Sequence, residues 1–299
     1  MSERTIGLGR SRIRPGRLVT MATTLALAAA LVAPQTTAGA GPSLRPAILD
    51  VTGWKVQAAG APTPNAADGI GPGSYLLIDR TDGTFICTAN FVWNGAGTQY
   101  LGAAGHCFLT TNENSLKDGN HVRSVAVCTT NCFFGGQLGA VVQGTFATLG
   151  AVVYARQNDP SAPDPTDIGH DFGLVTIPTG LSSQVRTAVP VWGGPNASSA
   201  AVVQGDPVCV YGNGVGLGET FPTRARAGVA EEQQAGAWYA ALPASPGDSG
   251  SGVVNCSTTK AVGILTHLVV GVPGGTAGTT VAQAVSMASS DGGLSISLA

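Results

Sequence analysis

After residue 73, the chain consists mainly of short apolar runs that alternate with turn-forming residues. β-Branched and aromatic residues are frequent within the runs, and Gly, Asn, Asp and Pro gather between them, which is typical of strands joined by turns. The predicted strands cover 75–79, 85–93, 99–103, 122–128, 140–155, 172–177, 208–211, 238–242, 252–255 and 262–272.

The apolar positions show little helical periodicity. Only "TVAQAVSMA" at 280–288 follows a period of 3.6 residues. Many short strands with turn signals indicate a barrel or a sandwich, and the strands form two groups on either side of residues 178–205. We therefore predict an all-β protein of two packed β-barrels and allow for one short C-terminal helix.

Composition supports a folded, strand-rich protein. Of the 299 residues, 43% are hydrophobic and 11% are charged, and 43 are Gly. Disordered chains carry more charge, and helical bundles are richer in Glu, Lys and Leu, so both classes are excluded.

The first forty residues differ from the rest. Five arginines precede an apolar stretch at 18–32, and Ala-Gly-Ala follows at 38–40. This layout is typical of a secretory signal peptide, with an uncleaved N-terminal anchor as the alternative. We expect a signal peptide at 1–40, a linker or short pro-segment at 41–73, and a secreted, extracellular domain at 74–299. Its first barrel would span about 74–178 and its second about 186–288.

Charge excludes two classes of partner. Without residues 1–40, ten basic and sixteen acidic residues remain, a net charge of −6, and no Lys/Arg cluster is present. Nucleic-acid binding and anionic-membrane binding both depend on positive charge, so we expect neither.

The six cysteines all follow the predicted signal peptide. They are Cys87, Cys107, Cys128, Cys132, Cys209 and Cys256. An even count in an exported chain favours three disulfides over free thiols. The rival interpretation is a zinc site. No C-x-x-C pair is present, and no His stands close to Cys128 or Cys132, so we expect no metal and no cofactor.

Three separate motifs carry candidate chemistry. "SPGDSGSG" at 245–252 is either a flexible Gly/Ser loop or the setting of a nucleophile, Ser249. Serine is a weak nucleophile that needs a base, and the base needs a carboxylate to orient it. His106 in "YLGAAGHC" and Asp171 in "HDFGLVTIP" are the candidates. The amides of Gly247 and Ser249 would then bind a developing oxyanion.

Each candidate also has a plain structural interpretation. A lone His beside a turn is more often structural, and an Asp before a strand is more often an ordinary turn residue. His170, which adjoins Asp171, is the competing base, and His121 is expected to be a surface or structural residue.

Taken together, the motifs resemble those of the chymotrypsin-fold (trypsin-like) serine proteases secreted by bacteria. "GAAGHC", "DFGLV" and "GDSGSGV" resemble the boxes around the family's His, Asp and Ser, and they occur in the same chain order. The resemblance covers about residues 74–288. It implies two six-stranded antiparallel β-barrels, with His106 and Asp171 from the first and Ser249 from the second.

The same resemblance implies two disulfides. Cys87 with Cys107 would match the disulfide that restrains the family's His loop, and Cys209 with Cys256 would match a pair behind the Ser. Cys128 and Cys132 have no family counterpart, and we infer a local loop disulfide between them.

Specificity residues are also carried over from the family. Pro243 and Ala244 would line the first pocket, opposite Thr266 and His267. Trypsins have a carboxylate at the position of Pro243, so cleavage after Arg or Lys is not expected. A medium-sized apolar side chain is the expected preference, and Glu, favoured by a pocket His, is the alternative. Thr266 could also support Asp171 by a hydrogen bond.

Activation departs from the animal members of the family, which free an apolar N-terminus to pair with the Asp before the Ser. The chain has no basic-Ile-Val-Gly-Gly site. Asp248 therefore needs another partner, and we hypothesise Arg224 or Arg226.

The function implied is a secreted, monomeric serine endopeptidase that acts on protein or peptide substrates through an acyl-enzyme. Two alternatives stay open. The first is a catalytically silent homologue that serves as a binding or adhesion module. The second is an acyl hydrolase that uses the same residues on another substrate.

Overall fold

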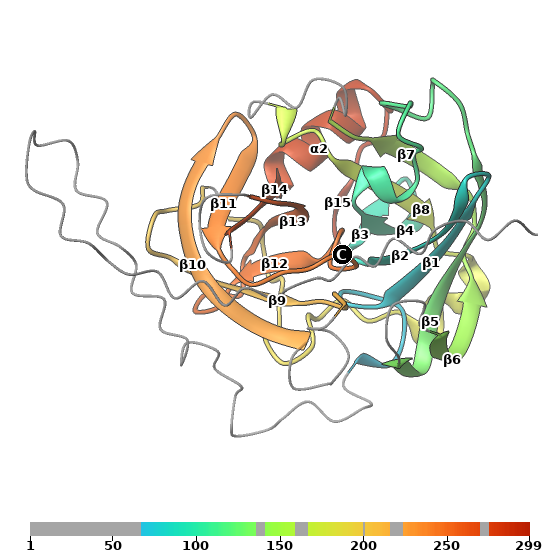
Figure 1. Ribbon diagram of the computed structural model, residues 1–299, viewed down its shortest axis with the longest axis horizontal. Helices are drawn as coiled ribbons and strands as arrows, with labels where there is room; N and C mark the ends of the chain where they lie inside the picture. The colour runs from blue at the N-terminus through green and yellow to red at the C-terminus, as the bar shows by residue number, and fades with distance from the viewer. Residues whose placement is uncertain (1–66, 136–140, 159–166, 200, 216–223, 270–274) are drawn as a thin grey trace, which may run out of the picture. The chain divides into compact units, whose positions relative to one another are not determined.

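The computed structural model describes residues 67–135, 141–158, 167–199, 201–215, 224–269 and 275–299 (Figure 1). The predicted signal peptide at 1–40 and most of the predicted linker at 41–73 lie outside these residues, as do the ends of the strands predicted at 140–155 and 262–272. No helix in the described ranges is long and apolar enough to cross a membrane.

The first half of the described chain, together with the C-terminal strand, forms two antiparallel sheets. One has the order β2-β1-β5-β6 and the other β15-β3-β4-β8-β7. Their strands are β1 (Tyr75–Arg80), β2 (Gly83–Thr88), β3 (Val92–Gly95), β4 (Thr98–Ala103), β5 (Val122–Gly135), β6 (Val141–Thr148), β7 (Val152–Arg156), β8 (Phe172–Thr176) and β15 (Ser297–Leu298). Two 3₁₀ turns, η3 (Gly105–Cys107) and η5 (Thr179–Gln184), follow β4 and β8.

These two sheets enclose a single core. Leu76 and Ile78 of β1, Leu101 of β4 and Val175 of β8 belong to one cluster of buried side chains. At one corner the Leu149 amide donates to Val125 O across 2.9 Å, and the next residue, Gly150, donates to Thr176 O across 2.8 Å. The half expected to be the first barrel is therefore two sheets that share a core and are joined through their connecting residues.

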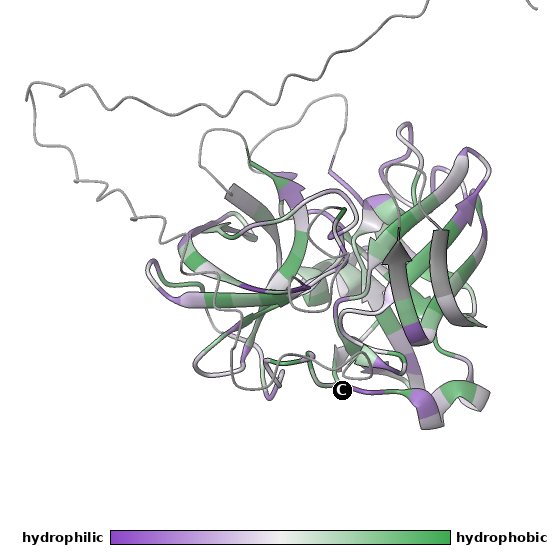
Figure 2. Cartoon of the chain, turned by 60° about the horizontal axis from the view of Figure 1, so that its bottom comes forward, coloured by the Kyte–Doolittle hydropathy of each residue, from purple (hydrophilic) through white to green (hydrophobic). Residues whose placement is uncertain are grey.

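The second half forms a closed antiparallel barrel in the order β10-β11-β14-β13-β12-β9. Its strands are β9 (Pro207–Tyr211), β10 (Ala225–Gln234), β11 (Ala237–Ala241), β12 (Gly252–Asn255), β13 (Ala261–Leu268) and β14 (Gly275–Thr280). They carry the orange and red colours of Figure 1, and Figure 2 shows hydrophobic and polar positions alternating along several strands. The prediction of an all-β protein with a six-stranded barrel is confirmed.

Two hairpins have the tight turn that matches strand twist. Ala96 and Gly97 between β3 and β4 have φ of 48° and 78°, and Ala235 and Gly236 between β10 and β11 have φ of 47° and 82°. Positive φ at both central residues defines the type I′ turn, which fixes the register of the flanking strands.

The short C-terminal helix is present as α2 (Val281–Ser290). Thr280 caps it, because its hydroxyl accepts a hydrogen bond from the Gln283 amide across 3.2 Å. Its buried residues, among them Ala284 and Met287, belong to a core cluster that also contains Phe172 of β8 and Ile264 of β13. This cluster joins side chains of both halves.

Pattern analysis missed β10 and β14, because their residues are mostly small or polar: "ARAGVAEEQQ" and "GTAGTT". All six residues of β14 are nevertheless buried. A Cβ at Gly278 would lie 1.7 Å from Ile264 O of the neighbouring strand, so close approach of the two backbones requires a residue without a side chain there.

We predict that Gly278→Ala lowers the free energy of unfolding by about 3 kcal/mol or more, because the contact is with rigid backbone. Gly180→Ala is the matched control, since a Cβ there meets nothing within 4 Å and Gly180 has no positive φ. Denaturant unfolding should show the control within about 0.5 kcal/mol of wild type. Equal effects of the two substitutions would contradict this account of β14.

Candidate active site

His106 lies in the 3₁₀ turn η3, two residues after β4 ends. Gly105 is required before it, because a Cβ at Gly105 would lie 1.8 Å from Arg156 O. After it, Cys107 forms a disulfide with Cys87 of β2. The turn is therefore held against β7 on one side and tied to β2 on the other.

All three expected disulfides are present in the structure. They are Cys87–Cys107, Cys128–Cys132 and Cys209–Cys256. Cys87, His106 and Cys107 form the one cluster of potential metal ligands among the described residues, but both sulfurs belong to the disulfide. Oxidised cysteine offers no thiolate, so this cluster is not a metal site.

Asp171 immediately precedes β8 and is fully buried. One carboxylate oxygen, Oδ2, lies 2.6 Å from His106 Nδ1, and the other accepts a hydrogen bond from the His106 amide across 3.0 Å. The backbone of Asp171 is held from β14. Its amide donates to Thr279 Oγ1 across 3.1 Å, and Thr279 Oγ1 donates to its carbonyl across 2.9 Å.

The pair shifts the pKa values of both partners. Burial alone would raise the pKa of Asp171, but the charge and hydrogen bonds of His106 hold it below its usual range. Burial alone would likewise lower the pKa of His106, but the Asp171 carboxylate raises it above the ordinary value of 6.5. The His106 side chain is 32% exposed, so one edge of the ring is open to a reactant.

Ser249 lies in the loop between β11 and β12, and this loop is fastened to the first half of the chain by Thr88 at the end of β2. The Thr88 amide donates to Ser249 O across 2.9 Å, and its hydroxyl donates to Gly247 O across 2.8 Å. A Cβ at Gly250 would lie 2.8 Å from the amide nitrogen of Ala104. The loop therefore packs directly against the end of β4, next to the His106 turn.

No hydrogen bond joins Ser249 Oγ to the His106 imidazole, although the structure describes both residues. Hydrogen bonds between a nucleophile and its base are often long in the absence of substrate, so Ser249 and His106 stay the candidates for these two roles. The structure brings His106 and Asp171 into direct contact and places the Ser249 loop beside them.

Some backbone amides of the Ser249 loop donate hydrogen bonds, and others are open, with no acceptor among the described residues. The amides of Asp248, Gly250 and Ser251 donate to Ser245 O, Leu265 O and Asp248 O. Neither Gly247 nor Ser249 donates an amide hydrogen bond to any residue that the structure describes. Gly247 has φ of 101°, a conformation that favours glycine. The two amides are thus available for an anion.

The Asp248 carboxylate is fully buried and paired with Arg226 of β10. Arg226 donates twice, across 2.7 and 2.6 Å, in the planar fork that guanidinium groups form with carboxylates. The amides of Gly214 and Ser245 also donate to Asp248, across 2.7 and 2.9 Å. Of the two hypothesised partners, Arg226 is confirmed. Arg224 instead donates to the Tyr75 hydroxyl and to Cys132 O.

Of the expected specificity residues, Pro243 and Ala244 lie in the Ser249 loop itself and are half-buried, and His267 is half-buried on β13. Thr266 differs from expectation, because its hydroxyl lies 2.7 Å from His267 Nδ1 rather than contacting the Asp171 carboxylate. The other ring nitrogen of His267 lies 3.1 Å from Asn158 Oδ1, and burial lowers the pKa of His267. The imidazole of His267 is therefore neutral near pH 7.

The remaining histidines have other partners. His170 Nδ1 lies 2.5 Å from Asp167 Oδ1, and His121 Nδ1 contacts the buried carboxylate of Glu113. His170 therefore pairs with Asp167, whereas Asp171 pairs with His106.

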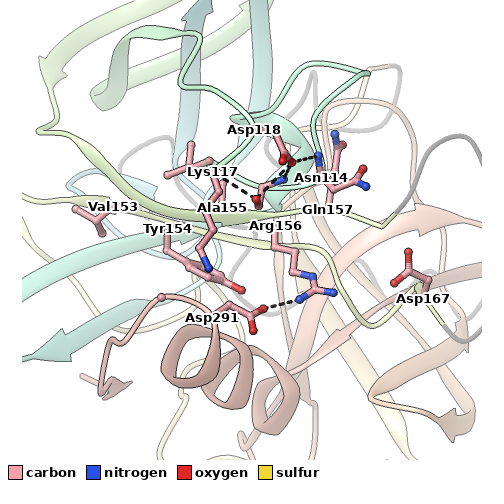
Figure 3. Close-up of a pocket in the computed structure, with 13 residues that line it drawn as sticks. Asn114, Lys117, Asp118, Val153, Tyr154, Ala155, Arg156, Gln157, Asp167 and Asp291 are labelled. Carbon is pink, nitrogen blue, oxygen red and sulfur yellow. Dashed lines mark hydrogen bonds and ion pairs between the residues drawn. The ribbon is translucent and has the colours of Figure 1, made fainter.

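A hollow of about 640 Å³ is lined by neither His106 nor Ser249 (Figure 3). Residues 114–118, 153–157, Asp167 and 291–292 line it. Its charged groups are largely paired with each other or with backbone: Arg156 lies 2.5 Å from Asp291, and Asp118 accepts from the Asn114 and Ser115 amides. The Arg156–Asp291 ion pair therefore joins the end of β7 to the end of α2 along the wall of this hollow.

Sequence analysis missed Thr88, Thr279 and their roles. A threonine at the end of a strand carries no motif, and only the pairing of distant strands places it beside the candidate residues. The sequence-predicted His106, Asp171, Gly247 and Ser249 do lie within one region of the structure, at the contact between its two halves.

No protein-family model and no curated protein matches the sequence. Solved structures similar to the chain include a thermostable serine protease, AL20, from an extremophilic microorganism, at 18% identity with a TM-score of 0.48, covering 69% of this chain and 89% of that one. Protease Anisep from Arthrobacter nicotinovorans has 14% identity, a TM-score of 0.47 and coverage of 71% and 92%. Protease A from Thermobifida fusca has 17% identity, a TM-score of 0.43 and coverage of 78% and 100%.

The structures that this chain resembles are thus bacterial serine proteases of the chymotrypsin fold. With identities of 14–18% and TM-scores below 0.5, these likenesses do not establish an activity.

We predict strong coupling between Asp248 and Arg226, because removal of either partner leaves the other as a buried, unpaired charge. In a double-mutant cycle of Asp248→Asn and Arg226→Met, the interaction measured by denaturant unfolding should be about 3 kcal/mol. The same cycle with Arg224→Met is the control and should give less than about 0.5 kcal/mol. Similar coupling to both arginines would contradict the assignment.

Proposed function

We propose that the chain is a secreted serine endopeptidase in which Ser249, His106 and Asp171 form a catalytic triad. The observation that carries this proposal is the buried Asp171 carboxylate, 2.6 Å from His106 Nδ1, beside a loop in which the amides of Ser249 and Gly247 are open. A serine, a partly exposed imidazole and a buried carboxylate in this order of contact are the parts needed to activate a hydroxyl nucleophile.

In the first step, Ser249 Oγ attacks the carbonyl carbon of a peptide bond while His106 Nε2 takes the hydroxyl proton. The carbonyl oxygen becomes negatively charged and binds the amides of Gly247 and Ser249. His106 then gives the proton to the leaving amine, the C–N bond breaks, and an acyl-enzyme forms on Ser249. Water attacks the ester with His106 again as the base, which releases the acid and restores Ser249.

Asp171 performs two functions for the base. As a carboxylate it can only accept, so it holds the proton of His106 on Nδ1 and leaves Nε2 free toward Ser249. It also stabilises the imidazolium that forms during each proton transfer. Full burial makes both effects strong, because little solvent screens the pair.

The Ser249 loop is supported in its working shape by bonds within the described chain. Arg226 neutralises Asp248 from β10, and Thr88 binds the carbonyls on either side of Asp248. Because Arg226 fills the role that a freed N-terminus has in animal members of the resembled family, this loop does not depend on cleavage of the chain for its shape. In this loop shape, the amides of Gly247 and Ser249 stay open.

The proposed substrates are proteins or peptides with an uncharged residue before the cleaved bond. Pro243 brings no carboxylate to the expected first pocket, which disfavours Arg and Lys. Both ring nitrogens of His267 are engaged, by Thr266 and Asn158, so the ring presents a neutral wall rather than a cation for a Glu side chain. These contacts favour the apolar preference over the Glu preference.

Secretion is proposed from the leader-like residues 1–40 and from the three disulfides, which persist in oxidising compartments.

We predict that a fluorophosphonate probe labels the secreted wild-type protein and that Ser249→Ala abolishes labelling. Ser251→Ala is the matched control, because Ser251 is two residues away and fully buried, and it should keep the label. Mass spectrometry of the labelled peptide gives the site. An unlabelled, folded wild type would overturn the proposed enzyme and favour the catalytically silent alternative.

We predict that activity is lost on the acid side with a midpoint above pH 6.5. His106 acts as a base only when neutral, and its pKa is raised by Asp171 above the ordinary 6.5, so it protonates at a higher pH than a free histidine. Asp171→Asn should reduce kcat about 10⁴-fold, because the amide can hold the wrong tautomer of His106. Asp167→Asn, which alters the partner of His170, should leave kcat within about twofold of wild type. An acid limb clearly below pH 6.5 would contradict the assigned pair.

A further inference from the structure

We propose that Arg80 is a positioning residue for His106, which fixes the backbone of the His106 turn and places a permanent positive charge behind the imidazole. This inference rests on the proposed function, because positioning has a catalytic meaning only where His106 acts as the base. Arg80 ends β1 and is 4% exposed, and no sequence motif draws attention to it.

Arg80 contacts the His106 turn through one nitrogen. Its NH1 donates to His106 O across 2.9 Å, approaches Cys107 O at 3.4 Å, and also donates to Leu109 O. Carbonyls at the end of a short helical turn have no partner within the turn, and buried carbonyls need one. Arg80 NH1 is the hydrogen-bond donor for three of these carbonyls, and it thereby fixes the direction in which the His106 side chain leaves the backbone.

Two neighbours orient the guanidinium. Asp82 accepts from Nε and NH2, each across 2.9 Å, in a two-point contact. The face of the Phe85 ring lies 3.7 Å from the guanidinium carbon, a cation–π contact. With one edge on Asp82, one face on Phe85 and NH1 on the turn, the planar group has a single orientation. A lysine ammonium, which is a point charge, cannot reproduce this set of contacts.

Three charged or titratable groups face His106, and a fourth lies behind one of them. Asp171 approaches from the start of β8, His267 from β13, Arg80 from β1, and Asp82 lies beyond Arg80 in the turn between β1 and β2. The Asp171 carboxylate favours the protonated imidazole, and the cation of Arg80 opposes it and lowers the pKa of His106. Arg80 thus limits the rise in the pKa of His106 that Asp171 causes, and Asp82 partly cancels the charge of Arg80.

A purely structural Arg80 is the competing explanation, because the β1–β2 hairpin also carries Cys87 and Thr88. The two explanations differ in one measurable property. Loss of a structural contact lowers stability without a defined effect on the titration of His106. Loss of a charge shifts that titration in a direction set by the sign of the charge removed.

The test is the NMR titration of the His106 imidazole in the full secreted chain carrying Ser249→Ala, which needs no activity. Arg80→Met should raise the pKa of His106 by about half a unit, because a cation is removed. Arg80→Lys keeps the charge and should stay within about 0.2 units. Asp82→Asn removes the neutralising carboxylate and should lower the pKa. Asp82 is exposed enough, at 37% of its side chain, for this variant to fold.

Kinetics in the Ser249 background separates charge from geometry. Arg80→Lys should lower kcat about tenfold with KM little changed, because the fork that fixes the turn is lost while the charge remains. Two outcomes of the titration would overturn the inference. In the first, the pKa of His106 is the same in Asp82→Asn as in Arg80→Lys. In the second, Asp82→Asn and Arg80→Met shift this pKa in the same direction. If the wild type resists the fluorophosphonate while Arg80→Met raises and Asp82→Asn lowers the pKa of His106, the proposed function is overturned. The effect of the Arg80 charge on His106 then still holds.

Discussion

The fully buried carboxylate of Asp171 is the constraint on which the site depends. A carboxylate without solvent needs donors, and here the amide and Nδ1 of His106 provide them at 3.0 and 2.6 Å. This need fixes the position of the His106 turn relative to β8. It also sets the tautomer of the imidazole, since a carboxylate accepts and does not donate. Because the proton stays on Nδ1, Nε2 of the neutral ring carries none and can accept one.

The β1–β2 hairpin connects this pair to the serine. Between Arg80 and Thr88 it supplies Arg80 to the carbonyls of the His106 turn, Cys87 to the disulfide with Cys107, and Thr88 to the carbonyls of Gly247 and Ser249. His106 and Ser249, which belong to opposite halves of the chain, thus share one support. In our proposed function, such common support maintains reacting groups in place more accurately than two independent loops would.

Sequence analysis identified the residues with distinctive chemistry and missed those with ordinary chemistry. His106, Asp171 and Ser249 stand in recognisable boxes, and two of the three cysteine pairs followed from the family resemblance. Thr88, Thr279 and Arg80 belong to no motif, because a threonine or an arginine at a strand end acquires its role from whatever strand lies opposite. The expected contact of Thr266 with Asp171 is replaced by its contact with His267, a choice made by side-chain direction on β13. Strand β14 escaped the pattern because close packing of backbones selects small residues there, and β10 escaped it because half of its residues are charged or polar.

By itself, the sequence determined that the chain is all-β and that its cysteines form disulfides, and it singled out His106, Asp171 and Ser249 as the candidates for base, carboxylate and nucleophile. These conclusions depend on residue type and local spacing, which are properties of a linear chain. The tertiary structure alone decided that Arg226 rather than Arg224 neutralises Asp248, although both arginines lie within three positions of each other near the start of β10. Side chains alternate across a strand, but which of two buried cations meets a carboxylate depends on the register between strands that are distant in sequence.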